Sequence, residues 1–202
     1  MQVLLSTTYF GPIQWYQKLY RAEEVFIERC ETFQKQTYRN RCLIATTNGI
    51  QALTVPVEKP STLNYIKDFR ISDHGNWRHL HWNALKSAYG ESPFFDYYQD
   101  DIRPFFERHW DYLFDFNEAI CEKMCELLDI QPTVRFTEEF TPPSINEIND
   151  YRSSIRPKHP DPDPDFISKR YYQVYEQKYG FMPNLSILDL LFNMGPESIL
   201  YL

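Results

Sequence analysis

A run of basic residues without interleaved acids is the first feature of this sequence that could do chemistry. Between Thr32 and Val57 the chain carries Lys35, Arg39 and Arg41 but no Asp or Glu, although its net charge is −7. The planar, two-pronged guanidinium group of arginine matches the oxygens of a phosphate or a carboxylate. We therefore predict that these three bases form an anion site. Arg41 is the first choice, because the apolar strand that follows it would hold it rigidly.

Tyr38 and Asn40 flank the arginines and are predicted to shape this site. Its ligand would be a small anionic molecule: a nucleotide sugar, a sugar phosphate or a carboxylate. The alternative is a solvated loop whose charges offset nearby acids such as Glu28 and Glu31. The chain has only six glycines and neither a G-x-G-x-x-G nor a Walker A motif, so side chains or a helix N-terminus would have to hold a phosphate.

Tyr9, His81 and Asp189 are the candidate catalytic residues. A histidine can act as a general acid or base near neutral pH, but His81 could equally be a hydrogen-bonded core residue. His79 and His81 would diverge by about 200° on a helix, so we predict no metal site there. If the protein is an enzyme, one of the three candidates should converge on the basic cluster.

Asp189 belongs to a polar stripe on an otherwise apolar C-terminal segment, residues 184–194. Ser186, Asp189 and Asn193 are spaced to share one face of a helix. This stripe is either the solvent-facing line of the helix or the polar wall of a pocket. We expect the helix as a whole to be mostly buried.

The N-terminal pattern predicts the elements that position these residues. Residues 2–9 read as a strand, 13–22 as a helix and 25–27 as a second strand, which is the opening of a parallel α/β sheet. The apolar runs 42–46 and 51–57, separated by Asn48-Gly49, predict a β-hairpin. We therefore expect a single compact α/β domain, residues 1–202, with a mixed, partly parallel sheet, flanking helices and a Rossmann-like start.

Composition limits the function classes. A strongly negative chain lacks the attraction to phosphate that dominates nucleic-acid binding, so we expect no nucleic-acid partner. We find no signal peptide and no apolar run long enough to span a membrane, and so expect a soluble, cytoplasmic protein with reduced cysteines. Cys121 and Cys125 read as buried helix residues and not as zinc ligands. Aromatic residues make up 17% of the chain and predict either a core of rings or a ring-lined cleft.

Stretches along nearly the whole chain resemble the WbqC-like family in the right order. They are Tyr9-Phe10-Gly11-Pro12-Ile13-Gln14-Trp15-Tyr16, Phe33-Gln34-Lys35, Tyr38-Arg39-Asn40-Arg41, Leu53-Thr54-Val55-Pro56-Val57, Ala88-Tyr89, Ser92-Pro93-Phe94-Phe95, and Leu185 to Asn193 with Gly195-Pro196. With this resemblance Gln14 joins the candidate ligand-binding residues. The opening also looks like the start of nucleotidyltransferase-type folds, which is an analogy of fold alone.

The resemblance implies a bacterial protein linked to O-antigen or other surface-polysaccharide clusters. A transferase role, such as the addition of an amino acid to a sugar, has been suggested for such proteins from genetic context. Many members have a His-Gln-Pro-like run after the first strand, whereas this chain has Ser6-Thr7-Thr8-Tyr9. If that histidine is catalytic elsewhere in the family, this chain lacks it. We therefore carry two hypotheses: a transferase in surface-glycan or nucleotide-sugar metabolism, or a non-catalytic binding or assembly protein. Neither the cofactor nor the oligomeric state can be read from the sequence.

Overall fold

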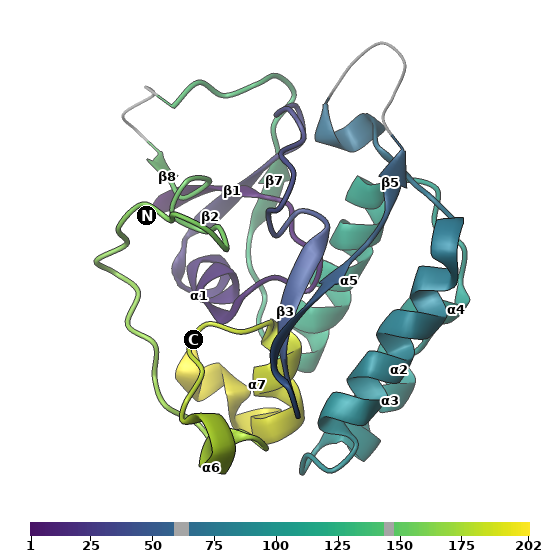
Figure 1. Ribbon diagram of the computed structural model, residues 1–202. Helices are drawn as coiled ribbons and strands as arrows, with labels where there is room; N and C mark the ends of the chain where they lie inside the picture. The colour runs from purple at the N-terminus through teal and green to yellow at the C-terminus, as the bar shows by residue number, and fades with distance from the viewer. Residues whose placement is uncertain (59–64, 144–147) are drawn as a thin grey trace.

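The computed structural model describes residues 1–58, 65–143 and 148–202, and Figure 1 shows their arrangement. In chain order the elements are β1 (Gln2–Ser6), α1 (Ile13–Arg21), β2 (Glu24–Glu28), β3 (Arg41–Thr46), β4 (Gly49–Thr54), β5 (Val57–Glu58), η1 (Ile66–Asp68), β6 (Arg70–Ile71), η2 (His74–Asn76), α2 (Trp77–Tyr89), α3 (Phe95–Ile102), α4 (Pro104–Glu107), α5 (Leu113–Leu127), β7 (Val134–Phe136), β8 (Asn149–Asp150), α6 (Glu176–Tyr179), α7 (Ile187–Met194) and η3 (Gly195–Tyr201).

A four-stranded parallel sheet forms the centre of the fold, in the order β7-β2-β1-β8. The predicted strand-helix-strand opening is confirmed, because β1 and β2 pair in parallel and α1 connects them. The first strand ends at Ser6 and not at Tyr9. Beyond Ser6 the chain leaves the sheet, and the backbone N–H of Tyr9 donates to the carbonyl of Tyr38 at 2.9 Å.

The antiparallel strands pair outside this sheet, β3 with β4 and β5 with β6. The α/β class with both parallel and antiparallel pairing is confirmed, but the two kinds of pairing lie in separate sheets. The predicted hairpin is present as β3 and β4. Thr46 pairs with Gly49, so Thr47 and Asn48 form the turn. Gly49 opens β4 with a φ of 95°, a conformation that favours glycine.

Aromatic rings fill much of the core, as one of the two composition-based readings predicted. Tyr9, Phe10, Tyr16, Phe116 and Phe192 have no exposed surface and belong to one apolar cluster. The same cluster contains fully buried side chains from the central strands β1 and β2, namely Val3, Leu5, Val25 and Ile27. Cys121 and Cys125 are buried thiols on α5, as predicted.

Helix α7 is buried along almost its whole length, which confirms the prediction for the C-terminal segment. It begins at Ile187, because the Ser186 hydroxyl accepts a hydrogen bond from the Leu188 N–H and so caps the helix. Ser186, Asp189 and Asn193 are at most 3% exposed, so the solvent-line reading of this stripe is wrong. Within the described ranges, no helix combines the length and apolar character that a membrane crossing requires.

Candidate functional site

The carboxyl edge of the parallel sheet contains a topological switch point. From β1 the chain runs to β2 and then to β7 on one side, and returns to β8 on the other side of β1. In open parallel sheets, ligands bind outside the carboxyl ends of the strands at such a point, because the connections diverge there and leave a crevice. The polar residues Ser6, Glu28 and Asp150 end β1, β2 and β8.

Arg39 lies at this edge in a buried ion pair with Glu31. Its Nε donates to Glu31 Oε1 at 2.8 Å, and its Nη2 donates to Ser6 Oγ at 2.9 Å. A second bond from Nη2 to Glu31 Oε2 makes the pair bidentate. The arginine side chain is only 4% exposed, so Glu31 supplies the neutralising charge that a buried guanidinium needs.

Arg152, just beyond β8, brings a second guanidinium to the same edge. Its Nε and Nη2 donate to the two oxygens of Asp150 at 2.9 and 2.7 Å. Its Nη1 lies 3.4 Å from Glu28 Oε2. The Glu28 carboxylate is fully buried and also accepts from Thr137 Oγ1 at 2.6 Å and from the Thr141 N–H at 2.8 Å. Glu28 therefore ties β2 and the segment after β7 to Arg152.

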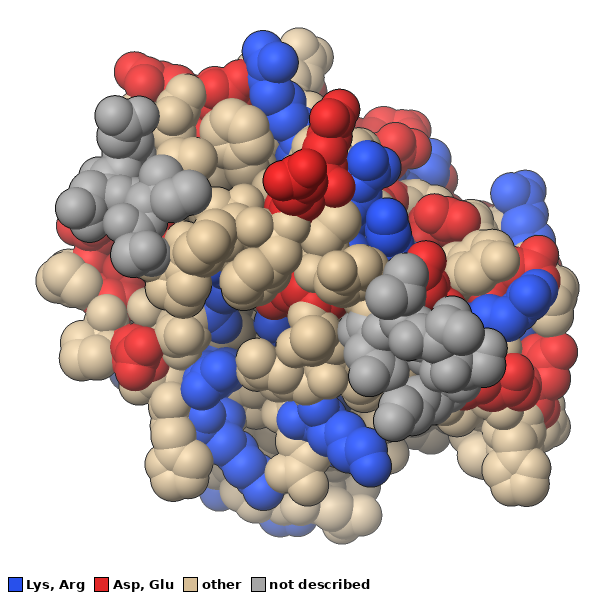
Figure 2. All heavy atoms as spheres, turned by 90° about the horizontal axis from the view of Figure 1, so that it is seen from above, with Lys and Arg blue, Asp and Glu red and all other residues tan. Residues whose placement is uncertain are grey.

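A hollow of about 140 Å³ opens beside these two arginines. It is lined by Glu31, Thr32, Gln34, Arg39, Phe140, Pro143, Asp150, Arg152, Ser153 and Arg156. Arg156 is partly exposed, and its Nη2 donates to Gln34 Oε1 at 3.2 Å. Exposed Lys158 similarly donates to Gln36 Oε1 at 3.1 Å. Two side-chain hydrogen bonds thus join the loop of residues 33–38 to the segment that follows β8. In Figure 2, lysine and arginine side chains gather in the lower centre, where few acidic side chains appear.

A second, enclosed cavity of about 10 Å³ adjoins the hollow and shares Arg39 and Arg152 with it. Its lining includes Ser6, Thr8 and Tyr38. The buried Thr8 hydroxyl has no hydrogen-bond partner among the described residues. This volume is about that of one water molecule. The run Ser6-Thr7-Thr8, which follows directly from β1, therefore lines this cavity.

The residues of the predicted anion site have different surroundings. Arg39 and Tyr38 are buried at the carboxyl edge, and Lys35 is exposed on the neighbouring loop. Asn40 is buried, and its Nδ2 donates to the Val55 carbonyl at 2.8 Å. Arg41 is partly exposed on the hairpin, where its Nε donates to Thr54 Oγ1 at 3.0 Å. The pairing of Arg39 with Glu31 matches the alternative that a nearby acid offsets the charge.

Tyr9 and His81 form a hydrogen-bonded pair inside the aromatic core. Tyr9 Oη lies 2.8 Å from His81 Nδ1, and the rings of Trp77 and Phe106 pack around the imidazole. Burial lowers the pKa of His81 to about 4, although a hydrogen bond with the backbone of Thr54 opposes this shift. The imidazole is therefore neutral at pH 7, and its Nδ1 shares a hydrogen bond with the Tyr9 hydroxyl, which keeps its proton because burial raises the pKa of Tyr9. Neither residue lines the hollow.

Asp189 lies in a different buried cluster. Its carboxylate accepts hydrogen bonds from Tyr89 Oη at 2.9 Å, Tyr171 Oη at 2.6 Å and Gln173 Nε2 at 3.0 Å. Burial raises the pKa of Asp189, whereas these three donors lower it. The structure thus brings Tyr9 and His81 together but places Asp189 apart from them, and none of the three lines the hollow.

Gln14 binds the acidic, proline-rich loop and not the basic run. Its Nε2 donates to Asp163 Oδ2 at 2.8 Å, and Lys18 Nζ, one turn later in α1, donates to Asp163 Oδ1 at 2.9 Å. Lys18 and Asp163 have side chains only 2% and 3% exposed. Most residues of this loop are exposed, but the Asp163 carboxylate is buried against α1.

Arg152 and Arg156 are the edge residues that sequence reasoning missed. They lie more than a hundred positions from Arg39, and the short strand β8 that positions them has little apolar patterning. No local signal could have joined them to the basic run. Among the described residues, no group of three or more His, Cys, Asp or Glu side chains could hold a metal ion.

Comparisons with known proteins place the chain in a family. The model of the WbqC-like protein family matches residues 7–153 and 160–201. A Mycobacterium tuberculosis (strain ATCC 25618 / H37Rv) protein, described as uncharacterized, is 30% identical over 200 residues, which cover 84% of this chain and 83% of the relative. No solved structure gives a significant match. Since the family match covers almost the whole fold, from the residues after β1 through the basic run to α7, the chain belongs to the WbqC-like protein family.

Proposed function

We propose that this protein is a transferase whose anionic substrate binds in the hollow at the carboxyl edge of the sheet. The substrate would be a nucleotide sugar, a sugar phosphate or a carboxylate, as expected for surface-polysaccharide or nucleotide-sugar metabolism. One observation carries the proposal: the guanidinium groups of Arg39, Arg152 and Arg156 converge beside the β1–β8 switch point. The transferase class rests on the role suggested for the family.

The contacts at the carboxyl edge support a different role for each residue in binding the anion and in proton transfer. Arg39 and Arg152 are held in place by carboxylates, so they form a rigid, preorganised wall of the hollow. Partly exposed Arg156 is the side chain that can turn toward an incoming anion. Glu31 faces the hollow as a carboxylate and would accept the proton of an acceptor hydroxyl or amine. Glu31 therefore takes the role of base in this proposal, and Tyr9, His81 and Asp189 would act only by maintaining the core.

A non-catalytic binding protein is the second candidate. It is favoured by the burial of Tyr9, His81 and Asp189 in hydrogen bonds away from the hollow, and by the engagement of Glu31 with Arg39. Such a protein would hold the same anion at the same arginines without turning it over.

Ligand titration with matched variants tests the site. Nucleotide sugars, sugar phosphates and amino acids are added to the folded protein, and binding is followed by calorimetry and by the unfolding midpoint. Arg156→Ala should weaken binding about ten-fold, because one charge-assisted contact is lost. Arg170→Ala is the control, since Arg170 is an exposed arginine paired with a single acid, Glu176. Equal affinity in both variants would show that the ligand binds elsewhere.

Turnover then separates the two candidate functions. A bound donor is incubated with acceptor sugars and amines, and products are followed by mass spectrometry. A transferase should form product in the parent protein and lose most turnover in Glu31→Gln while still binding donor. Binding without product in the parent protein favours the second candidate. Circular dichroism verifies that Glu31→Gln folds.

A further inference from the structure

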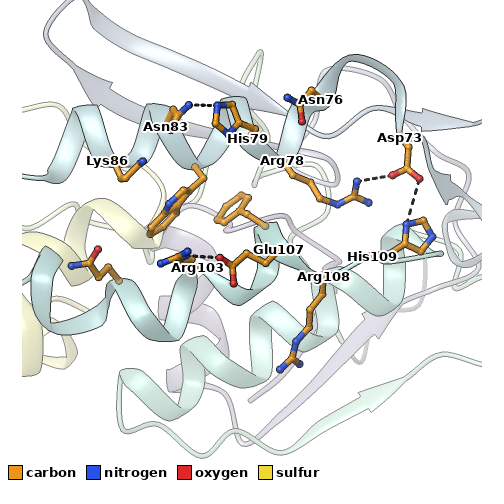
Figure 3. A pocket seen from close by; sticks show the side chains of 13 residues that line it. Asp73, Asn76, Arg78, His79, Asn83, Lys86, Arg103, Glu107, Arg108 and His109 are labelled. Atoms are coloured by element: carbon orange, nitrogen blue, oxygen red, sulfur yellow. Dashed lines mark hydrogen bonds and ion pairs between the residues drawn. The ribbon is translucent and has the colours of Figure 1, made fainter.

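A larger groove lies among η2, α2, α3 and α4, away from the carboxyl edge. Its volume is about 650 Å³. Figure 3 shows its lining, which includes Arg78, His79, Trp82, Asn83, Lys86 and Phe106. It shares no lining residue with the hollow. This volume suits a small organic ligand.

The groove is basic in an acidic protein. Its lining contains four cationic side chains and two carboxylates, whereas the whole chain has a net charge of −7. Glu107 pairs with Arg103, and Asp73 pairs with Arg78. Exposed Lys86 pairs with no acid among the described residues, and Figure 3 shows it on the wall formed by α2. The groove thus keeps an excess of positive charge that an anion would neutralise.

Arg78 has donors without acceptors. Its Nη1 donates to Asp73 Oδ1 at 2.5 Å, but its Nε and Nη2 are buried and have no hydrogen-bond partner among the described residues. Its guanidinium lies over the ring of Trp77, with 4.8 Å to the ring centroid. Unpaired buried donors are rare and costly, so they indicate an acceptor that the chain itself does not supply. An acceptor on a ligand bound at this end of the groove would supply it.

The groove also has an aromatic floor. Trp82 is half-buried, and its ring lies 5.8 Å from that of Phe106. Such a surface packs against the face of a nucleobase or of a sugar ring. Asn83 and His79 hydrogen-bond each other at 2.7 Å on the same wall and add polar groups for orientation.

We propose that this groove is a second ligand site, for a phosphate-bearing molecule with a ring. The ring packs on Trp82, the phosphate lies beside Lys86 one turn further along α2, and Arg78, one turn before Trp82, binds an acceptor at the opposite end of the ligand. Nucleoside phosphates and sugar phosphates share this chemistry. The proposal is independent of the site at the carboxyl edge.

Binding measurements with four probes test the proposal. Uridine diphosphate, glucose 1-phosphate, inorganic phosphate and uridine are titrated into the whole protein, and tryptophan fluorescence and calorimetry are recorded. We expect uridine diphosphate or glucose 1-phosphate to bind, and to bind more tightly than inorganic phosphate or uridine alone. If uridine diphosphate binds more tightly than glucose 1-phosphate, the ring on Trp82 is a nucleobase; the reverse order indicates a sugar. Equal affinity of inorganic phosphate would refute the aromatic subsite.

Variants locate the site. Lys86→Ala and Arg78→Ala should each weaken the tighter ligand about ten-fold or more. If Arg78→Ala does not fold, Lys86→Ala still tests the site, because Lys86 is exposed and its loss should not affect folding. Because a sugar phosphate could also bind at the carboxyl edge, the Lys86 and Arg78 substitutions are also made in the Arg156→Ala background, where binding to the groove should persist; Arg170→Ala should leave the affinity unchanged. Binding lost in Arg156→Ala but kept in Lys86→Ala, or no binding of any probe at millimolar concentration, overturns the proposal.

Discussion

The ionisable residues of the core have environments that change their chemistry. His81 is neutral because burial lowers its pKa to about 4, and Glu118 on α5 has its pKa raised by burial to about 8. Thr7 Oγ1 donates to Glu118 Oε1 at 2.9 Å and partly opposes that shift. Both groups therefore favour their neutral forms in the fold, and each makes stability depend on pH in a different window.

For His81, stability should fall as the pH falls from 6.5 toward about 4. In this window the unfolded chain takes up a proton at this histidine and the folded chain does not, so acid favours unfolding. One such group contributes at most about 1.4 kcal/mol per pH unit. Urea unfolding of His81→Gln, which can still accept from Tyr9, should show a weaker acid dependence than the parent protein. Identical dependence would refute a neutral His81.

For Glu118, stability should fall as the pH rises from 4.5 toward about 8. The folded chain keeps the proton in this window while the unfolded chain releases it, so base favours unfolding. Glu118→Gln preserves an acceptor for Thr7 but cannot ionise. This variant should therefore be more stable than the parent protein at pH 8. Its free energy of unfolding, measured with urea, should also change less with pH. Exposed Glu139 is not among the charges that shift the pKa of Glu118, so Glu139→Gln serves as the control and should not change the slope.

At the scale of elements, α1 anchors the loop that follows the 151–158 segment. The Asp163 carboxylate reaches Lys18 and Gln14, and Lys18 Nζ also lies 4.4 Å from the centroid of the Tyr151 ring. The Asp165 N–H donates to Asp163 Oδ1 at 3.2 Å, so the same carboxylate orders its own turn. A loop of prolines and acids is thus positioned by one buried ion pair.

Asp163→Ala should release this loop from α1 and destabilise the protein. The change leaves the Lys18 ammonium and the Gln14 amide buried without their acceptor, which typically costs about 3–5 kcal/mol. Hydrogen exchange measured by mass spectrometry should become faster in residues 160–166. Asp161→Ala, at an exposed position in the same loop, should leave both exchange and stability unchanged. Equal exchange in the two variants would contradict the anchoring role.

At the scale of the whole molecule, Asp189 joins segments from three parts of the chain. Tyr89 ends α2, Tyr171 and Gln173 precede α6, and Asp189 itself lies in α7. Tyr89 Oη also accepts from the Ala45 N–H at 3.3 Å and so extends the network to β3. The hairpin, the helical layer and the C-terminal segment therefore share one buried polar centre.

Asp189→Ala should weaken the whole fold and not one element. Three buried donors lose their acceptor, at a cost of about 1–3 kcal/mol for each. Thermal unfolding followed by near- and far-ultraviolet circular dichroism should show one transition at a lower midpoint with both probes. Glu139→Ala, at an exposed position, is the control. Separate transitions with the two probes would show that the C-terminal segment unfolds independently.

The sequence by itself determined the elements whose patterns are local. Alternation and apolar runs placed β1, β2 and the β3–β4 hairpin, and the continuous apolar stretch placed α7 in the interior. The WbqC-like resemblance also came from the order of short motifs along the chain, and the family match covers the same residues. These features depend on neighbours within a few positions, where side-chain type and backbone geometry are directly coupled.

Only the tertiary structure decided which charges meet. The basic run contains Arg39, but the surroundings of Arg39 come from Glu31, Ser6 and Arg152, which the pairing of parallel strands brings to one edge. From the sequence alone, the polar stripe around Asp189 could face either solvent or protein. It is buried because α2 and the 171–173 segment supply hydrogen-bond donors to the Asp189 carboxylate. The reason is that burial and ion pairing depend on contacts between residues far apart in sequence, and a sequence pattern carries no record of the neighbour that supplies the opposite charge.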